Sequence, residues 1–543
     1  MDSLQDCRRY LVDIDSNSTP QLFTNCLVIG AGIAGLRAAI EASSGCKVII
    51  VCKGTLENSN TWKAQGGIAS VFNNRDNFES HIADTLNTGC GLGDEKVVEM
   101  VIRQGPELIK QLQQWGTKFD IKEGHIAITS EAGHSHPRVV HAHGDETGRA
   151  IAEALIRKVR ENPNIKVIEN FFTIDLLTND DKQCTGVIGQ DKQGRQIIWA
   201  ANTILATGGA GRLYRETTNP EIATGDGISI AWRAGAVLQD LEFVQFHPTT
   251  LYVAGASRAL ITEALRGEGA ILVDSKGRAF MKDYHPSAEL APRDIVSRAI
   301  LSQMLKTKST HVFLDVRKFG KEYFSKRFPF INELCESFDI DITKDLIPVR
   351  PSAHYMIGGV KTSPDAKTSL PNLYACGEVA ATGLHGANRL GSNSLLEGLV
   401  FGKIAAQEVL KNIDSTSAHI KHPQILYKIP VSDRTRLDTE DVTNSLRALM
   451  WRNVGITRSS KPLREAQEII RFWHRYVMDK VFDSPDGWQC QNMLIAALLI
   501  AQASQMRNES RGVHFRSDYP EKNDAMYKKH IQITRGNKNS IVL

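Results

Sequence analysis

The sequence predicts an α/β protein with a Rossmann-type nucleotide-binding domain, and three observations support this prediction. A glycine motif, GAGIAG, lies between two short apolar runs near the N-terminus. Strand-like and helix-like segments then alternate over much of the chain, as in folds built from βαβ units. From about residue 416 onward the pattern changes to helical periodicity with few strand signals. The C-terminal part is therefore expected to be a separate helical domain.

The first unit reads as a strand, a glycine turn, a helix and a second strand. CLVIG is the first apolar run, LRAAIEASSG has helical spacing, and KVIIVCK is the second apolar run. Gly30, Gly32 and Gly35 have the G-x-G-x-x-G spacing of dinucleotide-binding folds. Gly30 permits the tight turn, Gly32 lets a pyrophosphate approach, and Gly35 permits close helix–strand packing. The motif therefore predicts a dinucleotide site at the N-terminus of the helix.

The remaining elements follow in chain order. Residues 1–25 are polar and turn-rich, which predicts a loose lead-in. The helices expected next are Val97–Trp115, Glu146–Arg160 and Leu395–Leu410, the strands are Lys166–Glu169, Gly186–Gly189 and Ile197–Ala206, and 241–351 mixes short strands with helices such as Pro292–Lys306. The C-terminal helices expected are Asp438–Trp451, Pro462–Met478 and Gly487–Met506. The irregular basic tail after them is interpreted as a solvated surface.

Composition excludes several classes of protein. A chain of 543 residues with 42% hydrophobic and 23% charged residues is typical of a globular protein of several domains. Its formal net charge of +4 gives no support for nucleic acid as a ligand. No apolar run reaches the roughly 18 residues of a membrane span, and the N-terminus lacks the apolar core of a secretory signal. Nine scattered cysteines without a C-x-x-C pair predict a reduced, cytoplasmic protein.

Two further glycine-terminated strands bear on the identity of the dinucleotide. The acidic residue expected about 20 positions after the motif is absent, and the second strand ends in Cys52-Lys53. A lysine there is compatible with the 2′-phosphate of NADP, and equally with a ribose or phosphate of FAD. ILATGGAG and PNLYACGEVA repeat the strand-then-glycine form, and the second carries Glu378, which can accept from a ribityl or ribose hydroxyl. Two such strands returning to one nucleotide fold favour the long dinucleotide FAD over NAD.

Six longer motifs resemble a known family. They are NTWKAQGGIA at 60–69, NPEIATGDGISIAWRAGA at 219–236, LEFVQFHPT at 241–249, TEALRGEGA at 262–270, ELAPRDIVSRAI at 289–300 and GLHGANRLGSNSLLE at 383–397. Together they are similar to the fumarate reductase and succinate dehydrogenase flavoprotein superfamily, and the similarity runs from about residue 26 to residue 520. Within that superfamily the sequence most resembles the L-aspartate oxidases, which catalyse the first step of de novo NAD biosynthesis via quinolinate.

The resemblance implies a Rossmann-type FAD-binding domain, an inserted α+β capping domain that closes over the substrate, and a C-terminal helical domain. The implied boundaries are a lead-in at 1–25, an FAD-binding domain at 26–240 and 352–415, a capping domain at 241–351, and a helical domain with its tail at 416–543. The implied cofactor residues are Gly30, Ala31, Gly32, Ile33, Ala34, Gly35, Lys53, Asn60, Thr61, Ala64, Gln65, Gly66, Gly67, Asp226, Glu378, Ser394 and Leu395. The implied catalytic residues are Arg293, His247, His354 and Glu131, with Arg389, Thr262 and Gln245 as substrate-binding residues.

The residue types in this set suit a dicarboxylate. Such a substrate needs cationic or donor groups at both ends, and the planar fork of arginine binds carboxylates bidentately. Taken singly, Arg293 and Arg389 are equally compatible with structural salt bridges, and His247 and His354 with core positions. Arginine is a poor acid or base because its pKa lies above about 12. The sequence therefore leaves open whether Arg293 is a base or an electrostatic clamp.

Two positions distinguish the branches of the superfamily. Succinate dehydrogenases and many fumarate reductases carry a histidine, bonded covalently to FAD, where this chain has Asn60. The resemblance therefore implies noncovalent FAD. The segment SEAGHSHPRVVHAHGDETG at 130–148 is similar to the aspartate oxidase segment whose glutamate, here Glu131, faces the substrate ammonium. A carboxylate has a physical role there, since a buried positive group needs a negative partner.

The same segment is rich in histidine. His134, His136, His141 and His143 lie within it, with His125 nearby. One interpretation is a zinc or iron site, and the other is a loop that folds over the flavin and substrate. No cysteine is close and the spacing fits no standard zinc pattern, so we expect no metal.

The expected function is FAD-dependent oxidation of L-aspartate to iminoaspartate, with O2 (giving H2O2) or fumarate as electron acceptor. Quinolinate synthase is the expected downstream enzyme, because the product is unstable. The alternative is the flavoprotein subunit of a membrane fumarate reductase or succinate dehydrogenase complex, against which Asn60 and Glu131 argue. A flavin-bearing binding or tRNA-modifying protein is a third class, disfavoured by the substrate-type residues and the near-neutral charge. Neither nucleic acid nor a membrane is expected as a partner.

Overall fold

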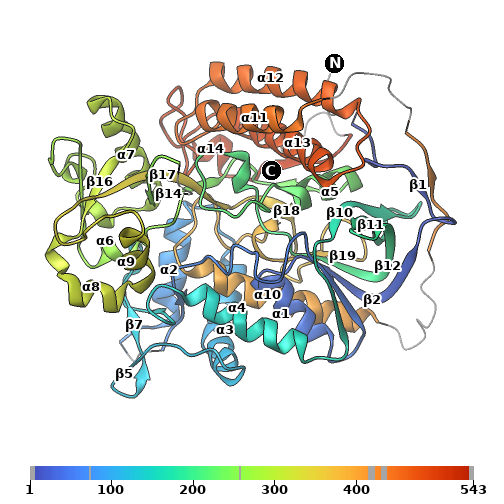
Figure 1. Cartoon of the computed structure of the whole chain (residues 1–543), viewed down its shortest axis with the longest axis horizontal. Coiled ribbons are helices and arrows are strands. Elements are labelled where there is room, and N and C mark those ends of the chain that lie inside the picture. Colours follow the sequence, from blue (N-terminus) through green and yellow to red (C-terminus); the bar gives the residue numbers. More distant parts are fainter. Residues whose placement is uncertain (1–6, 73–74, 256–257, 414–421, 430–436, 537–543) are drawn as a thin grey trace.

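A mixed sheet of seven strands forms the centre of the computed structural model, which describes residues 7–72, 75–255, 258–413, 422–429 and 437–536 (Figure 1). Its order is β10-β11-β12-β2-β3-β9, and β19 also pairs with β12. The strands are β2 (Gln21–Ile29), β3 (Val48–Val51), β9 (Ile165–Ile168), β10 (Phe172–Thr178), β11 (Cys184–Asp191), β12 (Gly194–Leu205) and β19 (Leu373–Ala375). The parallel pairing of β12, β2, β3 and β9 confirms the predicted Rossmann-type domain.

The glycine motif connects β2 to α1 (Ile33–Ala42) as predicted. Gly30 has φ 112°, and a Cβ atom there would collide with the carbonyl oxygen of Ala206. A Cβ at Gly35 would collide with the carbonyl oxygen of Gly30, so helix and strand touch at this point. On its other side α1 packs against α10 (Asn393–Asn412), where Gly398 and Gly402 leave room for the first turns of α1.

The helices expected from periodicity are present. They are α3 (Glu95–Gln114), α4 (Thr147–Arg160), α7 (Arg293–Thr307), α10, α11 (Thr439–Asn453), α12 (Ser460–Met478) and α13 (Pro485–Met506). The last three pack together at the top of Figure 1. Along α13 every residue from Cys490 to Ala501 is buried, so all faces of this helix are covered, and it packs against α12, α11 and α5 (Asp226–Ala234). These helices confirm the predicted helical character of the C-terminal part.

A second core lies in the chain between Leu251 and Val349, which we call the 251–349 unit. Its sheet has the order β14-β17-β16-β15, formed by β14 (Val244–Leu251), β17 (Ile347–Met356), β16 (Val312–Asp315) and β15 (Ile271–Val273). Helices α7, α8 (Lys321–Arg327) and α9 (Pro329–Glu336) complete it, at the left of Figure 1. The long strands β14 and β17 connect it to the rest of the molecule, so the unit enters and leaves through one antiparallel pair.

Two expectations for the chain ends were wrong. The lead-in is not loose over its described part, because Cys7, Leu11 and Val12 are buried and β2 begins at Gln21 rather than at Cys26. The amide of Leu11 donates to Asp175 on β10, which ties the segment to the sheet. Residues 1–6 of the lead-in lie outside the described residues, as do 414–421 around the predicted boundary at 415 and the last residues of the tail, 537–543.

The basic tail is also not a solvated surface where it is described. Arg507 pairs with Glu242 at 2.6 Å and with Glu509 at 3.0 Å, and all three side chains are fully buried. Arg516 is buried as well and pairs with Asp518. Charge composition missed this, because the acidic partners lie both within the tail and more than 200 positions earlier in the chain.

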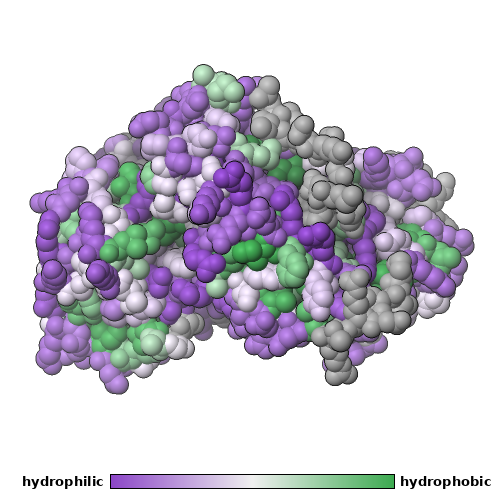
Figure 2. Space-filling view, turned by 90° about the horizontal axis from the view of Figure 1, so that it is seen from above, coloured by the Kyte–Doolittle hydropathy of each residue, from purple (hydrophilic) through white to green (hydrophobic). Residues whose placement is uncertain are grey.

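The face of the molecule on the side of the C-terminal helices is mostly polar (Figure 2). Figure 2 views the molecule from the side of the C-terminal helices and shows mostly hydrophilic residues with small, separated apolar patches. Within the described ranges, every helix falls short of the length or the apolar character that crossing a bilayer demands.

Candidate functional site

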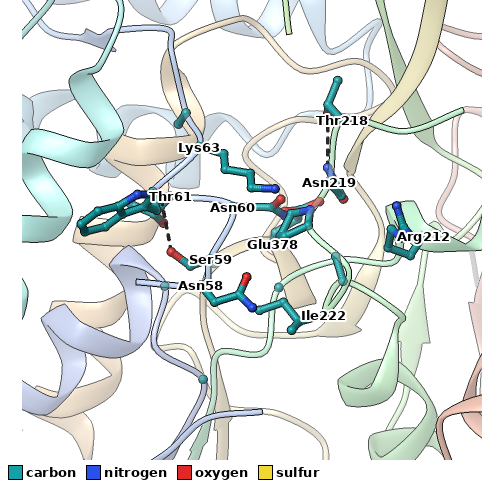
Figure 3. Close-up of a pocket in the computed structure, with 18 of the residues that line it drawn as sticks. Asn58, Ser59, Asn60, Thr61, Lys63, Arg212, Thr218, Asn219, Ile222 and Glu378 are labelled. Atoms are coloured by element: carbon teal, nitrogen blue, oxygen red, sulfur yellow. Dashed lines mark hydrogen bonds between the residues drawn. The ribbon is translucent and has the colours of Figure 1, made fainter. Parts of the chain in front are cut away.

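A cavity of about 1210 Å³ opens where the parallel strands of the central sheet end (Figure 3). Its walls include the turn after β2, the segment Ala206–Gly208 after β12, and the start of α10. Tyr252, Leu260, Phe330 and Leu334 from the 251–349 unit line the opposite side. Ligands of open α/β folds bind at the carboxyl ends of the strands, so the cavity lies where the glycine motif predicted it.

Most of the predicted cofactor residues line this cavity. They are Gly30, Ala31, Gly32, Ile33, Ala34, Lys53, Asn60, Thr61, Ala64, Gln65, Asp226, Glu378, Ser394 and Leu395. Gly35, Gly66 and Gly67 are not among the lining residues. Gly35 instead contacts Gly30, and a Cβ at Gly67 would collide with Val139 and Val140, so both lie where chain segments pack closely.

The hydroxyl and amide groups of the protein that line the cavity fit a dinucleotide. The cap residue of α1 is Gly32, which has no side chain, and the amide of Ile33 at the start of the helix donates to Thr61 Oγ1 at 3.0 Å. The positive end of the helix dipole at this point attracts phosphates. Thr207 Oγ1, Asn219 Oδ1 and Gln65 Oε1 are buried without a hydrogen-bond partner in the described part of the chain. Buried polar atoms are normally paired, so these three lining residues are placed to bind a polar ligand such as FAD.

The three charged residues predicted for the cofactor, Lys53, Asp226 and Glu378, are held by protein partners. Lys53 Nζ donates to Asp226 Oδ2 at 2.8 Å and to Thr224 Oγ1 at 2.8 Å. Asn60 Nδ2 donates to Glu378 Oε2 at 3.1 Å, and Figure 3 shows these two residues meeting from distant parts of the chain. Burial raises the pKa of Glu378 to about 7. Its carboxyl group therefore has both donor and acceptor character near neutral pH.

The two predicted arginines meet at one amide oxygen. Arg293 Nη1 and Arg389 Nε each donate to Gln245 Oε1 at 3.2 Å. The amide nitrogen of Gln245 donates to Asn388 Oδ1 and to the carbonyl of Arg389, both at 2.9 Å, which fixes its orientation. Arg293 is the first residue of α7, after Pro292. Gln245 lies on β14, Arg293 at the start of α7 and Arg389 in the loop before α10. The fold thus brings together three residues that are far apart in the sequence.

The two predicted histidines are neighbours and neutral. The rings of His247 and His354 lie 5.2 Å apart, and His354 Nδ1 lies 2.9 Å from Thr218 Oγ1. Burial, together with Arg293 and the other histidine, holds the pKa of His247 well below its ordinary value. Burial, Arg389 and Arg293 do the same for the pKa of His354. Neutral imidazoles offer hydrogen bonds to a substrate without adding to the charge of the site.

Glu131 lies beside Arg293, although they are far apart in the sequence. A Cβ atom on Gly391 would be 2.9 Å from Arg293 Nη2 and 3.4 Å from Glu131 Oε2, so both side chains surround this glycine. The carboxylate of Glu131 is buried and accepts a hydrogen bond of 2.6 Å from Ser392 Oγ. Thr262 is buried two residues before Ala264, whose amide donates to the Thr262 hydroxyl at 3.4 Å.

Not all of the predicted substrate residues face the open cavity. His354 and Arg389 line it, whereas Arg293, His247, Thr262, Gln245 and Glu131 are not among its lining residues. The hydrogen bonds of Gln245 and the contact between the histidine rings connect the two groups.

Sequence reasoning missed Glu263. It accepts from Arg293 Nε at 2.6 Å and pairs with Arg266 at 3.1 Å, and it is buried. Burial opposes its ionisation, but Arg293 and Arg266 outweigh this and hold the pKa of Glu263 below its ordinary value. The signal was present in TEALRGEGA, where this acid follows Thr262 directly, but one sequence cannot show which arginine it faces.

The histidine-rich segment is tied to protein groups. His134 Nε2 lies 3.1 Å from the carbonyl oxygen of Gly391, and His141 Nε2 lies 2.8 Å from Thr129 Oγ1. Burial lowers the pKa of His141 to about 3. Across the described ranges, no three or more histidine, cysteine or acidic side chains are grouped in a way that would hold a metal ion.

Comparisons with known proteins find relatives over nearly the full length of the chain. The FAD binding domain model matches residues 25–395, and the model of the fumarate reductase flavoprotein C-terminal region matches residues 443–542. The L-aspartate oxidase of Streptomyces coelicolor is 39% identical over 93% of this chain and 90% of that protein. The L-aspartate oxidase of Yersinia pestis is 40% identical over 93% of this chain and 97% of that protein.

Solved structures show the same fold. FrdA of the E. coli quinol fumarate reductase superposes with a TM-score of 0.87 at 30% identity, covering 95% of this chain and 96% of that chain. Sdh1 of Mycobacterium smegmatis gives a TM-score of 0.82 at 31% identity, covering 94% of this chain and 92% of that chain.

Proposed function

This chain belongs to the L-aspartate oxidase family of fumarate reductase-type flavoproteins, and we propose that it oxidises L-aspartate to iminoaspartate in the cavity beside Arg293 and Arg389. Its cofactor is FAD. When bound, FAD accepts the hydride from the substrate Cα and passes the electrons to O2, giving H2O2, or to fumarate. The arrangement around Gln245, where two guanidinium groups share one oxygen, carries the assignment of the substrate site.

The cofactor is held noncovalently by the residues that line the cavity. The N-terminus of α1 would hold the pyrophosphate, and the pair Lys53–Asp226 lies on the wall near β3. The unpaired atoms of Thr207, Gln65 and Asn219 supply hydrogen-bonding groups. Asn60 takes the place of the histidine that bonds flavin in the dehydrogenase branch, and an amide forms no such bond.

The charges of the site match an amino dicarboxylate. Arg389 and Arg293 bind the two carboxylates, and Glu131 pairs with the ammonium group. His247 and His354 add neutral hydrogen-bonding groups, because burial and the two arginines keep them unprotonated. A bare dicarboxylate lacks the positive group that Glu131 would face, so this residue favours aspartate over succinate.

Arg293 acts as an electrostatic clamp in this proposal. Its Nε donates to the ionised Glu263 and its Nη1 to Gln245, and both contacts favour the charged guanidinium. The clamp would orient one carboxylate of the substrate. The segment 241–351 serves as the capping domain and excludes water through residues such as Phe330 and Leu334.

We also propose that the protein is cytoplasmic and that a second enzyme consumes its product. All nine cysteines are free thiols, as expected in a reducing cytoplasm. Quinolinate synthase, or another enzyme that condenses an unstable imine, would consume the product.

A peroxide assay on the purified, FAD-loaded protein tests the function. L-Aspartate is expected to give H2O2 and succinate none, with fumarate accepting electrons when O2 is removed. The alternative, a dehydrogenase or reductase subunit, is supported by the close superposition on FrdA. Succinate oxidation with an artificial acceptor, and no aspartate-dependent peroxide, would establish that alternative instead.

A further inference from the structure

A buried carboxylate lies behind the substrate arginine and has no role in the proposed reaction. Glu397, on α10, is 1% exposed and is not among the residues that line the cavity. Its Oε2 accepts from Tyr355 Oη at 2.8 Å and lies 3.1 Å from His385 Nε2, and its Oε1 accepts from Thr382 Oγ1 at 2.6 Å. A buried charge is costly unless it is paired and hydrogen-bonded, and these three partners supply that compensation.

The carboxylate is ionised. Burial favours the neutral acid, but the neighbouring His385 and the hydrogen bonds from Thr382 and Tyr355 outweigh it and hold the pKa of Glu397 below its ordinary value. A negative group therefore lies at the hydroxyl end of Tyr355.

The ring of Tyr355 contacts Arg389, the proposed substrate arginine. Arg389 Cζ lies 4.3 Å from the centroid of the Tyr355 ring, the distance of a cation–π contact. Burial and the nearby Arg293 lower the pKa of Arg389 to about 10, so its charge is in an unfavourable environment. A phenol that donates to a carboxylate becomes richer in electrons, which strengthens the attraction between the ring and a cation.

We propose that Glu397 is a positioning residue, which acts through Tyr355 to hold the guanidinium of Arg389 in the orientation that binds a substrate carboxylate. It touches neither substrate nor cofactor. The inference rests on the proposed function, which makes Arg389 a carboxylate ligand. The affinity for dicarboxylates would then depend on the buried charge of Glu397, which reaches Arg389 through Tyr355.

The test measures binding rather than turnover alone. Malonate, a dicarboxylate with no amino group to oxidise, is titrated into the FAD-loaded protein and followed by the flavin absorbance. Tyr355→Phe and Glu397→Gln are each expected to weaken malonate binding by roughly tenfold. The double variant is expected to be no weaker than the weaker single variant, since both changes interrupt the same connection.

Three further measurements separate this positioning role from a general loss of packing. Thr382→Val removes a hydrogen bond from the same carboxylate without touching the ring, and should leave malonate affinity within about twofold of the parent. In Glu397→Gln the KM for L-aspartate should rise with the malonate dissociation constant while kcat changes much less. Arg389→Ala tests the proposed function by itself, because malonate binding that survives it would mean that the carboxylate site is elsewhere.

Several outcomes would overturn the inference. Parental malonate affinity in Tyr355→Phe would do so even if Glu397→Gln failed to fold. A double variant whose loss equals the product of the single losses would show that the two residues act independently. A loss of melting temperature and FAD content in Glu397→Gln, with unchanged KM, would leave Glu397 a purely structural residue.

Discussion

In the proposed reaction, Glu131 is the residue that selects the substrate. In Glu131→Gln the charge-assisted hydrogen bond to the substrate ammonium is lost, a contribution of about 1.5–3 kcal/mol. The kcat/KM for L-aspartate should fall by about one to two decades. Fumarate has no ammonium group, so its reduction should be unchanged or faster. Assays of both reactions on the same variant provide the control, and equal losses in both would mean that Glu131 only shapes its loop.

In the proposed reaction, Arg293 is the residue that turnover requires. Arg293→Leu should abolish turnover and leave FAD bound, because the side chain contacts Glu263 and Gln245 and does not line the cavity. Lysine should restore little, since a point charge replaces a planar fork. Arg298→Leu, on the same helix, is the matched control and should keep most of the activity. A kcat near the parent value in Arg293→Leu would contradict the assignment.

Asn60 determines how the flavin is attached. Its amide donates to Glu378 and cannot form the histidyl bond of the dehydrogenase branch. Acid precipitation should therefore release all of the yellow cofactor into the supernatant. Flavin fluorescence that remains on the denatured chain in a gel would contradict noncovalent binding.

At the scale of elements, helix α13 supports the cofactor site from the C-terminal domain. Asn492 Nδ2 donates to Asp226 Oδ1 at 2.8 Å, and its Oδ1 accepts from Arg233 at 2.6 Å. Asp226 lines the cavity and holds Lys53, so α13 fixes one wall of the FAD site.

Asn492→Leu should therefore weaken FAD binding by about tenfold, because Asp226 loses one of its fixed partners. At saturating FAD the KM for L-aspartate should be unchanged. Asn444→Leu, at an exposed position on α11, is the control. The measurement is the FAD dissociation constant of the apoprotein, taken well below its unfolding temperature. An unaltered constant would show that α13 stabilises the fold without affecting the cofactor.

At the scale of the whole molecule, the carboxyl group of Asp145 forms hydrogen bonds between the segment before α4 and the 251–349 unit. Asp145, just before α4, accepts from the amides of Phe330 and Ile331 at the start of α9, both at 3.2 Å. Burial, with a smaller effect of Glu146, raises the pKa of Asp145 to about 6. The folded state thus binds this proton more tightly than the unfolded state does.

The resulting pH dependence has a definite sign. Between about pH 4 and pH 6 the native protein holds more protons at this site than the unfolded chain, so this contribution to stability falls as pH rises. Asp145→Asn should raise the melting temperature by about 2–4 °C at pH 8 and by little at pH 4. Glu161→Gln, an exposed carboxylate at the end of α4, should show neither effect. A gain that is equal at both pH values would mean that ionisation of Asp145 is not its source.

Local sequence determined most of the helices and strands, and it predicted the residue types of the cofactor and substrate sites. The spacing of Gly30, Gly32 and Gly35 predicted a strand–turn–helix, and Gly30 and Gly35 lie where a Cβ atom would collide with a backbone oxygen. The periodicity of α3, α4 and α12 is a property of neighbouring residues. Tertiary structure decided what lies far apart in the chain. Glu131 meets Arg293 beside Gly391, Glu397 reaches Arg389 only through Tyr355, and the arginines of the tail find buried acids. Burial and pairing set the charge of these groups, and both depend on which distant segments the fold brings into contact.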